Sequence, residues 1–81
     1  MELTSFTEFL VKSLVKDPDM VAVKELESED DTIVIEVLVG EDDMGAVIGR
    51  SGKIANAIRT LVQASAYVNG GKKVRINIDS F

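Results

Sequence analysis

The residues best suited to chemistry in this 81-residue chain follow one another without a gap: Gly49, Arg50, Ser51, Gly52 and Lys53. Glycine lets the backbone turn sharply and lets another molecule come close, because it has no Cβ atom. Arg50 and Lys53 supply positive charge and Ser51 supplies a hydroxyl group. The amide groups at the start of a helix can donate to an anion. The segment therefore predicts capture of a phosphate group.

The charge of the chain is unevenly distributed. Its formal net charge is -5, but residues 1–43 hold thirteen acidic residues against three basic ones, whereas residues 44–81 hold six basic residues and one acid, Asp79. The basic residues of this second part are Arg50, Lys53, Arg59, Lys72, Lys73 and Arg75. The part of the chain that carries the loop is therefore compatible with a polyanionic partner, which the acidic pI conceals. Lys72, Lys73 and Arg75 either extend the phosphate track or only solubilise the last strand.

The composition excludes most enzyme mechanisms. The chain has no histidine and no cysteine, so it lacks the usual acid–base group near neutral pH, thiolate metal ligands and disulfides. The glycine loop is too short for a Walker A motif, and Lys53 is followed by Ile54 instead of Ser or Thr. The acidic clusters lack EF-hand spacing and are interpreted as solvated turns and helix caps. We expect no enzyme activity, no metal, no cofactor and no small-molecule substrate.

The hydrophobic pattern predicts six elements. Leu3, Phe6, Leu10 and Leu14 recur at helical spacing, with Ser5 and Glu8 at the spacing of a capping box. The pattern predicts a helix over 4–16, strands over 21–27 and 32–39, helices over 44–48 and from 52 or 53 to 67, and a strand over 74–79. Asp42 and Asp43 are expected to cap the short helix. These elements must hold the glycine loop between two helices.

The order helix, strand, strand, helix, helix, strand predicts an α+β fold in one domain, residues 1–81. The second strand alternates cleanly, with Ile33, Ile35, Val37 and Val39 on one face. A hairpin plus a third strand, reached through a helical crossover, gives a three-stranded mixed sheet whose apolar face the helices cover.

Aromatic residues make up only 5% of the chain, and Phe6, Phe9 and Tyr67 are expected in the core or at an interface. No apolar stretch is long enough for a membrane span, so the expected location is the cytoplasm.

The run Met44–Val62, MGAVIGRSGKIANAIRTLV, resembles the core of a KH domain. The element order is similar to the prokaryotic type II KH arrangement. The whole chain resembles the stand-alone bacterial KH proteins of the KhpA (YlqC) family. By this resemblance, Gly49–Gly52 would clamp the backbone of single-stranded RNA along an adjoining groove. Val47, Ile48 and Ile54 would form the apolar floor of that groove or would simply pack in the core.

The same resemblance implies partners and a process. It implies a homodimer, and a heterodimer with a larger, Jag-type KH protein (KhpB). That pair would act as a post-transcriptional regulator or RNA chaperone linked to cell elongation and division. An alternative from a different class is a protein-interaction module in which the glycine loop lies at a dimer contact. The net charge of -5 favours this alternative.

Overall fold

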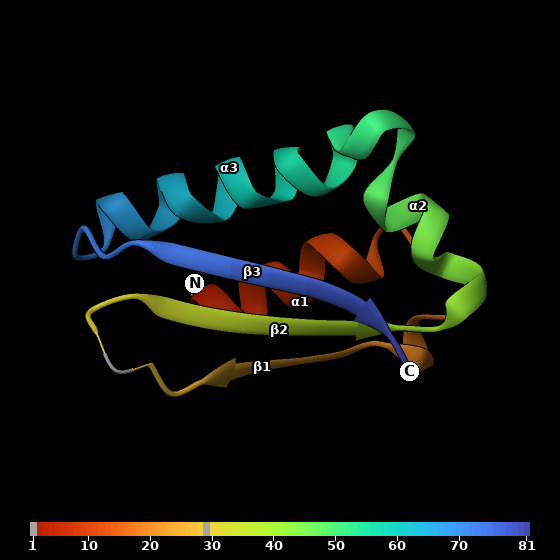
Figure 1. Ribbon diagram of the computed structural model, residues 1–81, viewed down its shortest axis with the longest axis horizontal. Coiled ribbons are helices and arrows are strands. Elements are labelled where there is room, and N and C mark those ends of the chain that lie inside the picture. Colours follow the sequence, from red (N-terminus) through yellow and green to blue (C-terminus); the bar gives the residue numbers. More distant parts are fainter. Residues whose placement is uncertain (1, 29) are drawn as a thin grey trace.

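The computed structural model describes residues 2–28 and 30–81, and within them it has the predicted order of elements (Figure 1). The helices and strands are α1 (Leu3–Lys12), β1 (Ala22–Leu26), β2 (Ile33–Val39), α2 (Met44–Ile48), α3 (Lys53–Val68) and β3 (Val74–Ser80). Short 3-10 turns occupy Pro18–Met20, Glu41–Asp43 and Arg50–Gly52. Met1 and Glu29, the latter in the predicted turn before the second strand, lie outside the described residues.

The sheet has the strand order β1-β2-β3. Strand β1 pairs antiparallel with β2, and β3 pairs parallel with β2. The register sets Val23 and Ile78 opposite Val37, and Leu26 opposite Val34. Side chains alternate between the two faces of a strand, so Val23 points to the core face and Leu26 to the other. The predicted hairpin and the predicted three-stranded mixed sheet are confirmed.

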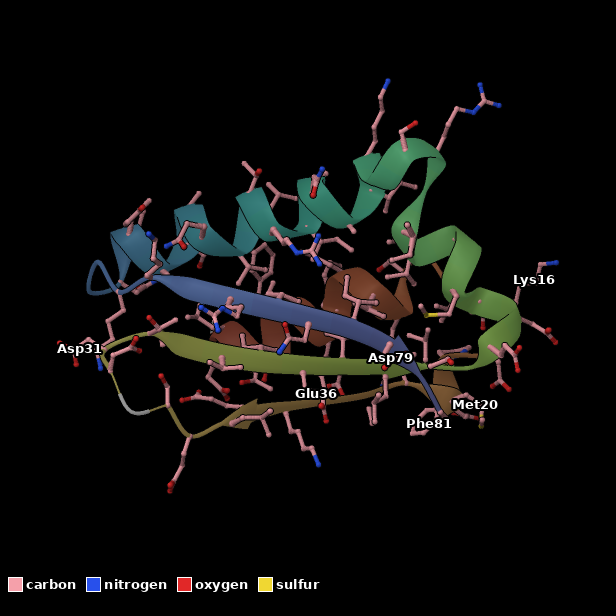
Figure 2. All side chains as sticks on the ribbon, viewed as in Figure 1. Lys16, Met20, Asp31, Glu36, Asp79 and Phe81 are labelled. Carbon is pink, nitrogen blue, oxygen red and sulfur yellow. The ribbon has the colours of Figure 1, made fainter. Side chains whose placement is uncertain are left out.

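One face of the sheet forms the core. Ile35, Val37 and Val39 are completely buried, and β3 adds Ile76. The helices contribute Val11, Val47, Ile58 and Val62 to the same cluster. Burying a side chain of this size stabilises the fold by roughly 1.5–3 kcal/mol. The helices therefore cover one face, while the opposite face carries polar residues such as Glu36 and Asp79, both seen along the sheet in Figure 2.

Helix α1 ends at Lys12, four residues before the predicted end at Lys16. The reason is a contact from far along the chain. The carboxylate of Asp43, which is only 4% exposed, accepts the backbone N–H of Lys16 at 3.0 Å and that of Asp17 at 3.1 Å. These amides are thereby held outside the helical hydrogen-bond ladder.

The predicted helix caps were wrong. Asp43 makes no side-chain cap bond to α2, because its carboxylate is used by the chain that follows α1. The N-cap of α1 is Glu2, also without a side-chain cap bond, and Ser5 lies inside the helix. Asp43 thus joins the end of α1 to the start of α2, and it fixes the segment that leads into the glycine loop.

Candidate nucleic-acid interface

The loop between α2 and α3 has an unusual backbone. The φ angles of Gly49, Ser51 and Gly52 are 77°, 57° and 75°. Gly49 donates its N–H to the carbonyl of Gly45 at 2.9 Å, and Gly52 donates to the carbonyl of Gly49 at 3.3 Å, which closes a tight turn. A non-glycine residue in the left-handed region costs roughly 1–3 kcal/mol, and such strain gathers at functional sites. Ser51 is therefore a candidate binding residue.

The two glycines of the loop are required for different reasons. A Cβ atom on Gly49 would lie 2.5 Å from Cγ1 of Ile54 and 2.9 Å from its backbone nitrogen. A Cβ atom on Gly52 would meet nothing closer than the side-chain nitrogen of Asn56, at 4.0 Å. Gly49 is thus required both by its φ angle and by the close approach of Ile54, whereas Gly52 is required only by its φ angle.

The loop presents positive charge to solvent. Arg50, Ser51 and Lys53 are exposed, and none of the salt bridges among the described residues involves Arg50 or Lys53. They stand at the N-terminus of the 16-residue helix α3, the positive end of its dipole. One of the first amides is already used, because the N–H of Lys53 donates to the carbonyl of Arg50. An anion at the loop would therefore meet the two positive charges, the hydroxyl group of Ser51 and the remaining amides.

The loop also lies far from one of the acidic segments. In Figure 1 it is at the opposite end of the molecule from the turn between β1 and β2. That turn contains Asp30 and Asp31, and Figure 2 shows Asp31 there. Charges separated by more than a Debye length of about 8–10 Å are largely screened. The net negative charge of the chain therefore need not repel a polyanion from the loop.

Val47, Ile48 and Ile54 were predicted to form the apolar floor of the groove or to pack in the core, and the structure separates them. Val47 has no exposed surface and belongs to the core cluster, so it cannot contact a ligand. Ile54 packs beneath Gly49 and lines a groove between α1 and α3. Of the three residues predicted for the floor, only Ile48 is partly exposed beside the loop without a packing role of this kind. Periodicity marked all three as apolar but could not tell which side of the helix pair each would face.

Arg59 lies further along α3, on the flank that faces β3. Its Nε donates to the carbonyl of Ile76 at 3.3 Å, and its Nη1 donates to Oδ1 of Asn56 at 3.3 Å. Gln63 does similar work one turn on: its Nε2 donates to the carbonyl of Lys72, and its Oε1 accepts the N–H of Val74, both at 2.9 Å. These side chains pair the outer edge of β3. Arg59 still has N–H groups to offer, because a guanidinium carries five.

A shallow hollow follows this flank. One part, of about 430 Å³, is lined by Arg59, Thr60, Gln63, Ala64, Tyr67 and Val74. An adjoining part, of about 330 Å³, shares Arg59, Gln63 and Val74 and adds Thr32, Lys73, Arg75 and Ile76. Sequence reasoning missed Asn56, Gln63 and Tyr67 as candidates. Their spacing from Arg59, in steps of three and four along a predicted helix, was the available signal.

The other flank of α3 is apolar. Leu61 is 50% exposed and Val68 is 84% exposed, and the exposed Ala57 lies one turn before Leu61 on the same flank. Together with Leu14 of the segment after α1, Leu61 lines a groove of about 360 Å³ between α1 and α3. An exposed apolar stripe of this kind marks an interaction surface.

Two features are absent from the described residues. No helix among them is long and apolar enough to cross a membrane. Within the same residues, no group of three or more acidic side chains is arranged to hold a metal ion.

Comparison with known proteins places the chain in a family. Residues 4–78 match the family model described as KhpA/KhpB, KH domain. The chain is 43% identical over 76 residues to the RNA-binding protein KhpA of Clostridium perfringens, covering 94% of this chain and 99% of that protein. It is 46% identical over 71 residues to KhpA of Clostridium acetobutylicum, covering 88% and 92%, and 42% identical over 71 residues to that of Mycobacterium tuberculosis, covering 88% and 82%.

Solved structures agree on the fold. The chain superimposes with a TM-score of 0.74 on Aquifex aeolicus Era bound to GDP and aluminium fluoride, at 19% identity. The match covers 98% of this chain and 30% of that one. A second Era structure, in complex with MgGDPNP and nucleotides of 16S ribosomal RNA, gives a TM-score of 0.69 at 19% identity, covering 96% and 29%. This chain therefore spans about a third of the length of Era, and the likeness concerns the fold alone.

The predicted type II KH fold is confirmed by the element order, the mixed sheet and these neighbours. The matching relatives carry the name of RNA-binding proteins and not of enzymes, which agrees with the expectation of a non-enzymatic chain. On the family model and on relatives that align over most of its length, this chain belongs to the KhpA/KhpB family of KH-domain proteins.

Proposed function

We propose that this chain acts as one KH unit that binds single-stranded RNA by holding its phosphate backbone at Gly49–Gly52. The observation that carries the proposal is the loop itself. Three positive φ angles make a sharp turn that leaves Arg50, Ser51 and Lys53 exposed at the start of α3. KH domains clamp about four nucleotides with such a loop. The names of the relatives support the same partner.

The path of the strand follows from the surface beside the loop. From Gly49–Gly52 and Lys53, the RNA passes the partly exposed Ile48 and then the free N–H groups of Arg59. Val47 and Ile54 support the loop from below without touching the strand. Phosphate contacts carry no sequence information by themselves, so binding through this loop has modest affinity and low sequence specificity.

The apolar flank of α3 supports a second part of the proposal, a homodimer. Leu61 and Val68 expose apolar surface that a second copy of the chain would cover. Two weakly binding loops held on one RNA raise the overall affinity through effective concentration. The same face is offered to a larger, Jag-type KH protein (KhpB), whose KH domain shares this family model. We assign the pair to post-transcriptional regulation or RNA chaperoning in the cytoplasm, linked to cell elongation and division.

A double substitution tests the RNA clamp. Arg50→Asp with Ser51→Asp removes one positive charge and sets two carboxylates against the phosphate. We expect RNA affinity to fall at least roughly tenfold at about 0.1 M salt. The log-log salt slope should fall by about 0.7 for each lost contact with a single strand. Fluorescence anisotropy with labelled single-stranded RNA measures both quantities.

The matched control makes the same change of charge elsewhere. Lys12→Asp with Ser5→Asp alters two exposed positions of α1, outside the loop, and should leave RNA affinity within about twofold. If the loop variant stays folded and binds RNA as tightly as the wild type, the clamp is wrong. The apolar groove between α1 and α3 would then favour the second candidate function, a protein-interaction module with little intrinsic RNA binding.

A further inference from the structure

Tyr67 lies at the far end of α3 from the glycine loop and is 61% exposed. Of the two places expected for Tyr67, the core and an interface, this exposure excludes the core. Its ring lines the hollow beside β3, together with Arg59 and Gln63. An exposed aromatic ring beside cationic side chains is the arrangement on which the bases of single strands stack.

The wall of the hollow next to Tyr67 is held in place by hydrogen bonds before any ligand binds. The amide of Gln63 bridges the carbonyl of Lys72 and the N–H of Val74, both at 2.9 Å, so the start of β3 is tied to α3 one turn before Tyr67. The turn after α3 is also held, because Gly71 donates its N–H to the carbonyl of Ala66 at 2.8 Å. A ligand at this place meets a rigid wall, and little conformational entropy is lost on binding.

Positive charge surrounds the hollow. None of its lining residues is acidic, and Lys73 and Arg75 join Arg59 there. Asp30 lies near enough to Arg75 for the arginine to lower the pKa of that carboxyl, although hydrogen bonds from Ser28 and Thr32 lower it more. Lys72 lines a different hollow, together with Glu2 and Leu3, and it is not part of the hollow beside β3.

The distance along α3 separates Tyr67 from the clamp. Lys53 and Tyr67 are fourteen residues apart in the helix, which is roughly 21 Å at 1.5 Å per residue. The four nucleotides that a KH loop clamps cover roughly 14 Å at the stacked spacing of about 3.4 Å. A strand held at the loop and running along this flank would bring a later nucleotide to Tyr67.

We propose that the far end of α3 is a second subsite for the same RNA strand, where one base stacks on the ring of Tyr67 and a neighbouring phosphate contacts Lys73. The proposal rests on the proposed function, because the strand must first be held at Gly49–Gly52. It extends the footprint beyond four nucleotides and adds binding by stacking, which tolerates any base.

Oligoadenylates of four and eight nucleotides test the subsite, with binding measured by fluorescence anisotropy and by NMR titration of the tyrosine ring. The wild type should bind the longer strand roughly tenfold or more tightly than the shorter one. Tyr67→Ser should lose most of that gain and leave the four-nucleotide strand unchanged, whereas Tyr67→Phe should keep the gain. Phe9→Ser removes an equally exposed ring, 59% exposed on α1, and should change neither affinity.

Eight-nucleotide strands with four abasic sugars at one end or the other separate stacking from phosphate contact. Loss of the Tyr67-dependent gain with one of these strands supports a stacked base. The subsite alone is overturned if the four-nucleotide strand binds but the gain with length is absent or survives in Tyr67→Ser. If the wild type binds neither length, the clamp and the subsite fail together.

Discussion

The two exposed flanks of α3 differ in chemistry although they belong to one helix. The buried stripe of the helix consists of Ala55, Ile58, Val62 and Ala66. On the β3 side, the side chains are Asn56, Arg59, Gln63 and Tyr67, and on the α1 side they are Ala57, Leu61 and Val68. At 3.6 residues per turn, a buried stripe leaves room for two such rows. One helix can therefore serve RNA on one flank and a protein partner on the other.

The net charge of this chain is a poor guide to its binding partners. The net charge of -5 argues against RNA as a partner. The polar flank of α3 and the loop before it nevertheless carry exposed basic side chains. The side chains of the apolar flank, Ala57, Leu61 and Val68, carry no charge. Function is set by where each side chain lies on the helix and not by the sum over the chain.

The largest expected effect comes from breaking the point where both flanks begin. Gly49→Ala would force a Cβ atom against Ile54 at a positive φ angle, and we expect it to lower the free energy of unfolding by roughly 3 kcal/mol. Gly52→Ala meets only the strain of the left-handed conformation and should cost roughly 1 kcal/mol. Denaturant titration measures both. Equal losses would contradict the different roles assigned to the two glycines.

Adjacent substitutions on α3 separate the flanks. Leu61→Asp introduces a charge into the apolar flank, and we expect self-association to weaken at least roughly tenfold while each chain keeps its affinity for a short RNA. Thr60→Asp puts the same charge into the polar hollow. It should weaken RNA binding by a factor of about two to five and leave the dimer intact. Sedimentation velocity and anisotropy measure the two properties, and the idea of separate flanks fails if both variants change both.

Much of the fold follows from local patterns. The alternation of Ile33, Ile35, Val37 and Val39 predicted the central strand, and its observed bounds differ from the prediction by one residue. The glycine spacing predicted the loop, and the hydrophobic pattern predicted a helix from residue 52 or 53 to 67, where α3 runs from Lys53 to Val68. These features depend on neighbours within about four residues, so the sequence contains their cause.

Other features depend on contacts between distant segments. The early end of α1 is caused by Asp43, more than twenty residues further along, and no local pattern could reveal it. The hydrogen bond from Arg59 to Ile76 and the open position of Tyr67 likewise depend on β3 lying beside α3. A helical pattern predicts which residues share a flank, but the tertiary fold decides what that flank faces.

The smallest expected effects come from Asp30, which lies outside α3 and near the polar flank. The pKa of Asp30 is lowered from 3.8 to about 2, first by the hydroxyl of Ser28 and then by the backbone N–H of Thr32. Because the folded-state pKa is the lower one, the ionised carboxylate stabilises the fold above about pH 4, and this contribution is lost as the pH falls toward 2. The difference in stability between the wild type and Asp30→Asn should shrink over that range in denaturant titrations.

The same variant also tests the RNA path. Asp30→Asn removes a negative charge that lies close enough to Arg75 to interact with it weakly, so the hollow beside β3 becomes more positive. We expect the eight-nucleotide strand to bind about twofold more tightly at low salt, with no change for the four-nucleotide strand, because only the longer one reaches Arg75. An equal gain for both lengths would indicate a general charge effect. No gain at low salt would mean that the strand does not pass Arg75, and the path along the polar flank would have to end before β3 begins.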